Sequence, residues 1–205
     1  MSGIEIIHIP RDEASIKTYI ERYKAFRLLT LQVAPESFGT TYASEAALSD
    51  QIWYDRLANP QARTWMAFRG DVVVGSITVV GPKQYHPDFV KNPWSPPTED
   101  LDPNPNPTYA HFSINWVFTS PSIRGKGVAK TLMTTALKWE IQKAADLGKE
   151  LVSTLGVDED NIAAVSLYKM FGFVQTHAAP RPGDDTRMGL LMRYFPGEKA
   201  AALVK

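Results

Sequence analysis

The sequence contains no cysteine. Disulfide bonds are therefore excluded, and the stability of the fold must come from packing. The absence of thiols also excludes a covalent intermediate on cysteine. An enzyme with this sequence must use other side chains or direct attack by its own substrate.

An excess of charge of one sign and long apolar runs are absent as well. Lysine plus arginine equals aspartate plus glutamate, at 22 each, which argues against a nucleic-acid-binding surface. No run approaches the ~18 apolar residues of a membrane helix, and the first residues do not resemble a secretory leader. With 205 residues and 44% apolar side chains, the chain suits a single domain over 1–205. We expect a cytoplasmic protein without nucleic-acid or membrane partners.

Apolar periodicity predicts an α/β (α+β) chain in which strands and helices follow one another. We expect helices over residues 12–33, 45–58, 128–147 and 161–171. We expect strands over residues 4–9, 64–68, 72–80, 109–119, 151–156, 173–177 and 187–195, and a loose tail over 200–205. The second and third strands form a hairpin across Arg69-Gly70-Asp71.

The most informative segment joins the strand over 109–119 to the helix that begins near Val128. Residues 122–129 of this segment are Ser-Ile-Arg-Gly-Lys-Gly-Val-Ala. Gly125 and Gly127 lack the Cβ atoms that would block a ligand from the backbone. The helix N-terminus that follows offers unpaired N–H groups and a partial positive charge. The segment indicates a phosphate-binding loop, with an ordinary strand-to-helix turn as the alternative.

Two other phosphate-binding motifs do not fit this loop. A Walker-type loop needs glycine before its Lys-Thr pair, but Ala129 precedes Lys130 and Thr131. A dinucleotide fingerprint needs a small residue where Lys130 stands. Arg124, Lys126 and Lys130 nevertheless concentrate positive charge at this place.

A second informative segment covers residues 161–173. Asn161 is expected to cap a helix and Gly172 to end it in the left-handed C′ position. The apolar face of this helix would consist of Ala164, Val165, Leu167, Tyr168 and Phe171. A generic capped helix explains these features, but not an asparagine and a tyrosine at these spacings after a phosphate loop.

Together the two segments resemble the signatures of the GNAT acyltransferase superfamily. The loop fits Q/R-x-x-G-x-G/A except at Ser122, and residues 161–173 fit N-x-x-A-x-x-L-Y-x-x-x-G-F at every fixed position. The resemblance covers residues 108–175 well. It implies the GNAT fold, a central mixed, mostly antiparallel sheet of about seven strands flanked by about four helices.

The resemblance also implies acetyl-coenzyme A as cosubstrate and no metal. Asn161 would contact the pantetheine arm. The pantetheine would pair with the main chain of Val117, Phe118 and Thr119, leaving its thioester between this strand and the next. The pyrophosphate would lie on the backbone N–H groups of Arg124, Gly125, Lys126, Gly127, Val128, Ala129 and Lys130.

The implied reaction is transfer of the acetyl group to a primary amine of a small molecule, by direct attack in a ternary complex. Two alternatives stay open. In the first alternative the acceptor is a protein lysine or N-terminus. In the second, the chain is a coenzyme-binding module without catalysis. The oligomeric state is open too, with a homodimer as one option.

Two residues are candidates for proton transfer. Tyr168 would lie near the coenzyme sulfur and protonate the departing thiolate, unless it is simply a core tyrosine. By alternation, residues 111, 113, 115 and 117 share one face of their strand. His111 stands there where many members of the superfamily carry a general base, and its imidazole can accept a proton from an ammonium substrate. The alternative is a histidine hydrogen-bonded inside the sheet, with Ser113 and Asn115 as weaker, water-holding candidates.

The other polar clusters of the sequence suggest no further chemistry. Asp158, Glu159 and Asp160 are interpreted as a solvated turn. His8, His86 and His177 are too scattered for a metal site, and no ligand spacing supports zinc.

One segment stands out by composition: residues 81–107 hold eight of the fifteen prolines. A connection of this length inside a domain is usually functional or disordered. Its aromatic residues and histidine either line an acceptor pocket, as a lid over the substrate, or pack a solvated insertion onto the sheet edge. These residues are Tyr85, His86, Phe89 and Trp94.

Overall fold

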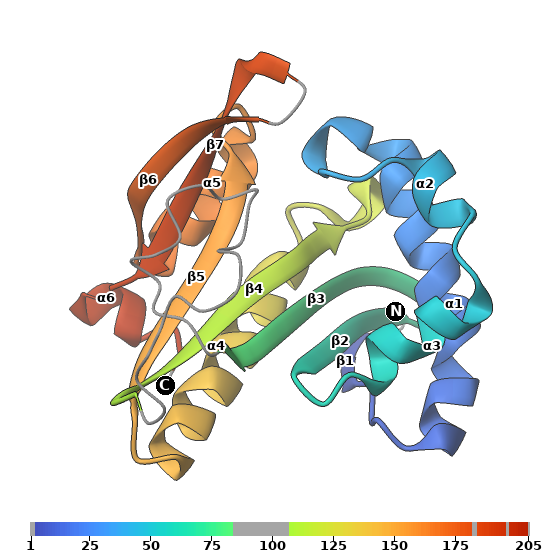
Figure 1. Ribbon diagram of the computed structural model, residues 1–205, viewed down its shortest axis with the longest axis horizontal. Coiled ribbons are helices and arrows are strands. Elements are labelled where there is room, and N and C mark those ends of the chain that lie inside the picture. The colour runs from blue at the N-terminus through green and yellow to red at the C-terminus, as the bar shows by residue number, and fades with distance from the viewer. Residues whose placement is uncertain (1–2, 84–106, 182–183, 196, 205) are drawn as a thin grey trace. The chain divides into compact units, whose positions relative to one another are not determined.

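The computed structural model describes residues 3–83, 107–181, 184–195 and 197–204. Its strands form one seven-stranded sheet in the order β1-β2-β3-β4-β5-β7-β6 (Figure 1). β4 is parallel to β5, whereas the pairs β1–β2, β5–β7 and β6–β7 are antiparallel. The predicted mixed sheet is therefore confirmed.

The strands are β1 Ile4–His8, β2 Ala62–Arg69, β3 Val72–Lys83, β4 Tyr109–Thr119, β5 Glu150–Asp158, β6 Phe173–Arg181 and β7 Asp184–Tyr194. The helices are α1 Glu13–Val33, α2 Tyr42–Ala46, α3 Asp50–Ala58, α4 Val128–Asp146, α5 Ile162–Met170 and α6 Glu198–Ala201. None of the helices in the described part of the chain is both long and apolar enough to span a bilayer.

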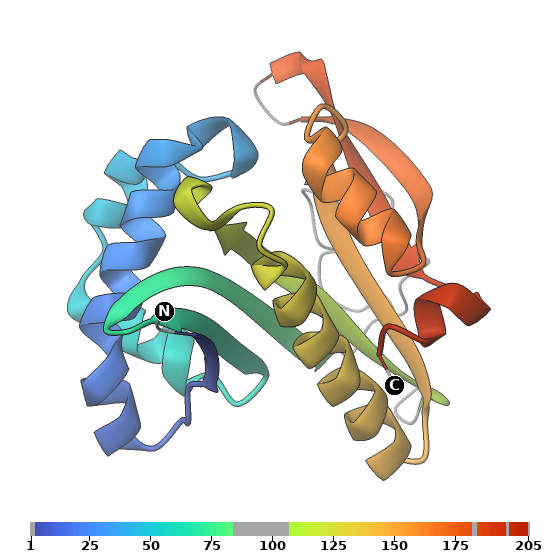
Figure 2. The same cartoon turned by 180° about the vertical axis from the view of Figure 1, so that it is seen from behind.

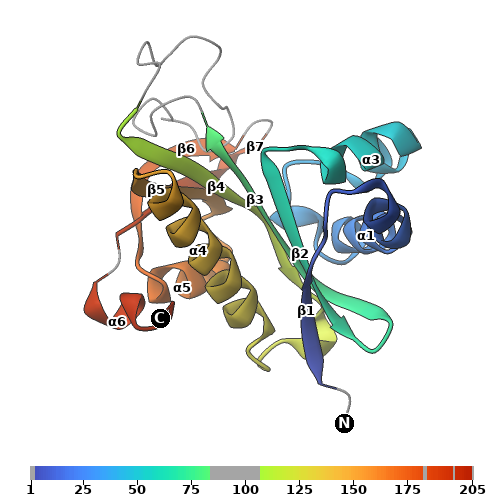
Figure 3. The same cartoon turned by 90° about the horizontal axis from the view of Figure 1, so that it is seen from below.

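The chain divides into two compact units. The first consists of residues 1–79 and 116–136. Within it, α1 and α3 cover one face of β1 and β2 (Figure 3). The core between them includes Tyr23 and Phe26 of α1, Trp53 of α3, and Met66 and Phe68 of β2. Burial of such large apolar side chains is the main stabilising contribution to the unit.

The second unit consists of residues 80–115 and 137–205. Here α5 lies against the strands β5 to β7 (Figure 2). Aromatic pairs join these elements: the ring of Phe173 lies 6.2 Å from that of Tyr168 and 5.4 Å from that of Tyr194. On the central strand, the ring of Phe112 packs edge-on against that of Trp139 of α4, with 5.6 Å between the ring centroids.

Side-chain caps and left-handed glycines define the helix ends, as predicted for Asn161 and Gly172. Asp12 caps α1 by accepting a hydrogen bond from the Ser15 N–H at 2.9 Å. Asn161 caps α5 by accepting from the Ala164 N–H at 3.2 Å. Gly148 and Gly172, with φ of 64° and 89°, are the second residues after α4 and α5 and adopt the left-handed conformation that favours glycine.

The single helix expected over 45–58 is wrong, because the structure has two. Thr41 and Ser44 form a capping box, so α2 begins earlier, at Tyr42. Ser49 then takes an extended conformation, with φ −65° and ψ 156°, and stands at the N-cap of α3. This conformation interrupts the helix that the apolar periodicity had suggested.

Several other boundaries differ from the expectation. The tail expected to be loose over 200–205 includes part of α6, and Ala200 and Val204 are buried there. β3 continues past residue 80 to Lys83, and β6 continues past residue 177 to Arg181. β7 begins earlier than expected, at Asp184, and ends at Tyr194. The aromatic candidates Tyr85, His86, Phe89 and Trp94 lie outside the described residues.

Candidate active site

The glycine loop has a backbone that only glycine adopts easily. Gly125 and Gly127 have φ of 76° and 79°, in the left-handed region. Apart from its chain neighbours, a Cβ atom added at either glycine would meet no atom of the described residues within 4 Å. Internal packing therefore does not require these glycines. Their backbone conformation and the open space beside them fit a loop that surrounds a ligand.

The start of α4 supplies the hydrogen-bond donors of this loop. The Thr131 N–H donates to the Gly127 carbonyl at 2.9 Å and makes the first intrahelical bond. The N–H groups of Val128, Ala129 and Lys130 precede it and have no carbonyl one turn earlier in the helix. Together with the helix dipole, these donors favour an anion at this end of α4.

The cationic side chains of the loop differ in their contacts. Arg124 turns back toward β4, where its Nε donates to the Thr119 carbonyl at 3.4 Å and its guanidinium lies 5.7 Å from the Phe118 ring. Lys126 and Lys130 are exposed. The loop thus has positive charge at its surface and a buried anchor, Ile123, beneath it.

The backbone near the end of β4 has an irregular conformation that no sequence pattern predicts. Trp116 has φ of 53°, the one positive φ outside glycine among the described residues. This conformation interrupts the alternation of side chains along the strand. The expectation that residue 117 shares a face with residues 111, 113 and 115 therefore does not hold. Val117 and Thr119 are half-buried, and Phe118 packs against Phe26 and Phe38, with both ring distances at 6.0 Å.

His111 lies inside the sheet on the paired part of β4. Its side chain has 0% exposure, and Nε2 lies 2.9 Å from the Thr154 hydroxyl. Thr154 in turn donates to the Phe112 carbonyl at 3.3 Å. Sequence reasoning missed Thr154, because only the parallel register of β4 with β5 brings it beside His111. The role of His111 as general base stays a prediction.

The two weaker candidates on β4 bind each other. The Asn115 amide donates to the Ser113 carbonyl at 2.9 Å and to the Ser113 hydroxyl at 3.3 Å. Ser113 is buried and Asn115 half-buried.

Tyr168 is placed on the buried side of α5, with 6% exposure. Burial raises the pKa of its phenol above the usual range, so the hydroxyl keeps its proton at neutral pH. Asn161 begins the same helix and uses its side-chain oxygen for the cap. The helix thus orients both residues through its cap and its packing against β6.

The acidic segment 158–160 is the predicted solvated turn only in part: Glu159 and Asp160 lie in an exposed turn, whereas Asp158 is the last residue of β5 and is buried. The Asp158 carboxylate is 1% exposed and forms ion pairs with Arg181 at 3.0 Å and Arg187 at 3.1 Å. Arg187 also binds Asp160 at 2.7 Å. These arginines come from the β6–β7 hairpin, too far along the chain for a local pattern to show. Among the described residues, no three His, Asp or Glu side chains are grouped as a metal site would require.

Comparison with known proteins gives a consistent result. Residues 27–173 match the sequence model of the acetyltransferase (GNAT) family. No curated protein matches the chain in sequence.

Many solved structures share the fold. A GNAT-family acetyltransferase from Streptococcus pneumoniae is 17% identical, with TM-score 0.62, covering 95% of this chain and 100% of its own. Arabidopsis thaliana NAA60, in complex with a bisubstrate analogue, is 16% identical, with TM-score 0.59 and coverage of 93% and 98%. The yncA protein of Salmonella typhimurium, solved with acetyl-CoA, is 17% identical, with TM-score 0.58 and coverage of 96% for both chains.

The family model spans most of the chain, and it includes the glycine loop, β4 and the Asn161–Gly172 helix on which the candidate site depends. The chain belongs to the acetyltransferase (GNAT) family.

Proposed function

We propose that this acetyltransferase moves an acetyl group from acetyl-coenzyme A to a primary amine of a small molecule. The observation that carries the proposal is the glycine loop. Two glycines with φ of 76° and 79° border open space at the N-terminus of the 19-residue helix α4. A pyrophosphate fits the donors and the dipole of such a helix end. The relatives solved with acetyl-CoA support this assignment.

In the proposed reaction the amine nitrogen attacks the thioester carbonyl directly. A nitrogen–carbon bond forms, the carbon–sulfur bond breaks, and the amine loses one proton while the thiolate gains one. Tyr168 is the proposed acid for the sulfur, because its buried phenol is protonated at neutral pH. With no cysteine in the chain, a cysteinyl acyl-enzyme plays no part.

His111 is the proposed base for the amine. The Thr154 hydroxyl donates to the Phe112 carbonyl, so it is left to accept from His111 Nε2 and orients the imidazole. Because the ring has no exposed surface, the proton is expected to reach it through water. Ser113 and Asn115 hold such a water in the competing version of the mechanism.

The coenzyme site is tested with a pair of glycine variants. Gly127→Val places a branched side chain in the open space of the loop and should abolish acetyl-CoA binding in calorimetry. Gly148→Val is the matched control, because Gly148 also has a positive φ, 64°, and open space around it. A folded Gly127→Val protein that binds acetyl-CoA as tightly as Gly148→Val would contradict the proposed loop.

The acceptor class is tested by a panel of small amines, amino acids and peptides, with release of the coenzyme thiol as readout. Highest kcat/KM on a small amine is expected. The competing acceptor is a peptide N-terminus, because one structural neighbour, Arabidopsis thaliana Naa50, was solved with the bisubstrate analogue CoA-Ac-MVNAL. Binding of acetyl-CoA without turnover of any amine would favour the non-catalytic module.

A further inference from the structure

A buried ion cluster in the first unit surrounds the irregular residue of β4. Glu45 of α2, with 2% exposure, accepts from Arg27 of α1 through both oxygens, at 2.8 and 3.2 Å. Arg56 of α3 binds the same carboxylate at 2.9 Å, and Thr40 donates to it at 2.7 Å. Burial opposes ionisation, but these donors outweigh it and hold the pKa of Glu45 at about 2. We call Arg27, Glu45 and Arg56 the Glu45 cluster.

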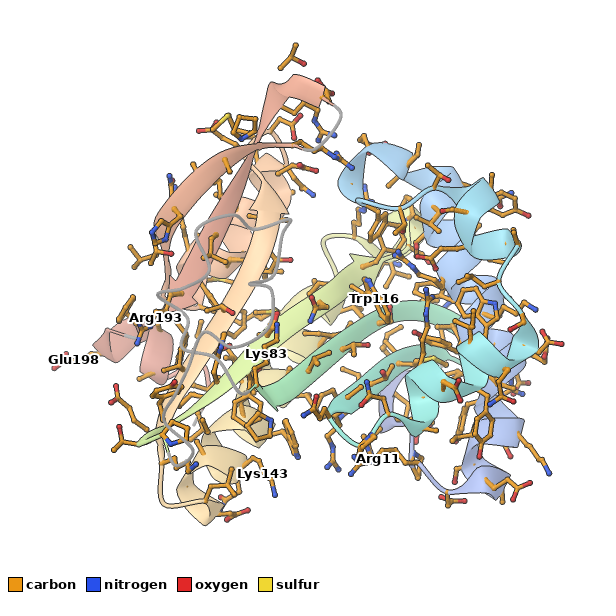
Figure 4. The ribbon with its side chains drawn as sticks, in the orientation of Figure 1. Arg11, Lys83, Trp116, Lys143, Arg193 and Glu198 are labelled. Atoms are coloured by element: carbon orange, nitrogen blue, oxygen red, sulfur yellow. The ribbon has the colours of Figure 1, made fainter. Side chains whose placement is uncertain are left out.

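Both arginines of the Glu45 cluster face the Trp116 indole. The guanidinium carbon of Arg27 lies 5.3 Å from the ring centroid and that of Arg56 lies 5.2 Å from it. These distances are within the range of cation–π attraction, which strengthens where the cation is desolvated. Trp116, labelled in Figure 4, is therefore held by side chains from α1 and α3 that share one carboxylate on α2.

Trp116 needs such support because of its backbone. A bulky residue with φ of 53° is strained, and that conformation persists only where surrounding contacts impose it. Ser76 adds one contact, since its hydroxyl donates to the Trp116 carbonyl at 3.4 Å. The three residues that follow, Val117, Phe118 and Thr119, are the segment assigned above to the pantetheine.

We propose that the Glu45 cluster positions the coenzyme-binding end of β4 by holding Trp116 in its left-handed conformation. Glu45 and its arginines are positioning residues here, because they act through Trp116 and not on the substrate. The inference rests on the proposed function, since the strand end matters for catalysis only if acetyl-CoA pairs with it.

The test is a double-mutant cycle between Arg56 and Trp116, read as the Kd for acetyl-CoA in calorimetry. Arg56→Gln removes one cation and one ion pair at a partly exposed site, whose side chain has 21% exposure. It is expected to raise Kd about tenfold. Trp116→Gly accepts the positive φ without support. In that background, Arg56→Gln should change Kd by less than about twofold.

Arg22→Gln is the matched control, because Arg22 lies on α1 with an exposed, distant partner, Asp71 at 4.0 Å. It should leave Kd unchanged. Glu45→Gln removes the shared carboxylate and should also raise the Kd for acetyl-CoA. If the Glu45 variant does not fold, the Kd of Arg56→Gln alone tests the proposal.

The outcomes distinguish a failure of the positioning role from a failure of the proposed function. An equal effect of Arg56→Gln in both backgrounds, or a lower melting temperature with unchanged Kd, overturns the positioning role and leaves the proposed function standing. Failure of the wild-type protein to bind acetyl-CoA overturns the proposed function, and this inference with it.

Discussion

Tyr168 is the residue on which the proposed proton transfer to sulfur depends. Tyr168→Phe keeps the ring that packs 6.2 Å from Phe173 and removes only the hydroxyl. We expect kcat to fall at least about tenfold, with the melting temperature and acetyl-CoA affinity nearly unchanged. Steady-state kinetics under conditions where chemistry limits the rate, together with calorimetry, would measure this.

Tyr194→Phe is a suitable control for that experiment, because Tyr194 is also buried and contacts Phe173. It should keep wild-type kcat. If Tyr168→Phe keeps it as well, Tyr168 is a core residue.

His111 is tested through the pH dependence of the reaction. His111→Ala should lower turnover by about 10²–10⁴ and leave acetyl-CoA binding nearly unchanged. Thr154→Val keeps the imidazole but removes its hydroxyl partner at 2.9 Å. Because that partner stabilises the protonated ring, the acidic limb of the kcat profile should move to lower pH.

A flat profile between about pH 6 and 9 would speak against His111. So would activity of His111→Ala within a few-fold of wild type. Either result returns His111 to the structural interpretation.

At the scale of elements, α5 combines a cap with a proposed coenzyme contact at one residue, Asn161. Its side-chain oxygen accepts from the Ala164 N–H at 3.2 Å. Asn161→Ala should lower the free energy of unfolding by about 1 kcal/mol and weaken acetyl-CoA binding. Asn161→Ser restores a capping oxygen without the amide, so denaturation should show recovered stability while calorimetry still shows weak binding. Recovery of both quantities in the serine variant would assign Asn161 to capping alone.

Some helix boundaries could be predicted from local sequence signals and others could not. Caps and stop residues are local chemistry, so Asn161 and Gly172 marked the ends of their helix correctly. The interval between α2 and α3 was missed because apolar periodicity continues across it, while the extended conformation of Ser49 interrupts the helix. Length of a periodic pattern alone does not separate one helix from two.

For the whole molecule, we expect the free energy of unfolding to depend on pH through Glu140. Its carboxyl is fully buried on α4 near Ser153 and Tyr194, and neither oxygen has a hydrogen-bond partner among the described residues. Burial raises its pKa from 4.5 to about 8, although the nearby Ser153 side chain acts in the opposite direction.

The sign of its pH dependence follows from that shift. Below pH 4.5 Glu140 is protonated in both states, and between 4.5 and about 8 the unfolded chain ionises first. Over that window this group should remove about 1.4 kcal/mol from the free energy of unfolding for each pH unit. Glu140→Gln removes the titrating group, so it should flatten this dependence and stabilise the protein most near pH 8. Urea denaturation across the window would measure this, and an unchanged slope in the variant would count against a buried, protonated Glu140.

Local signals in the chain were enough to identify the family, most of the order of strands and helices, and the glycines of the loop before α4. These depend on signals that neighbouring residues carry: glycine spacing, helix caps and apolar periodicity. Three contacts became known from the fold alone: Asp158 is a buried, ion-paired carboxylate, Thr154 hydrogen-bonds His111, and Trp116 lies against the Glu45 cluster. Each of these contacts joins residues far apart in the chain, and no local pattern encodes which buried charge meets which partner.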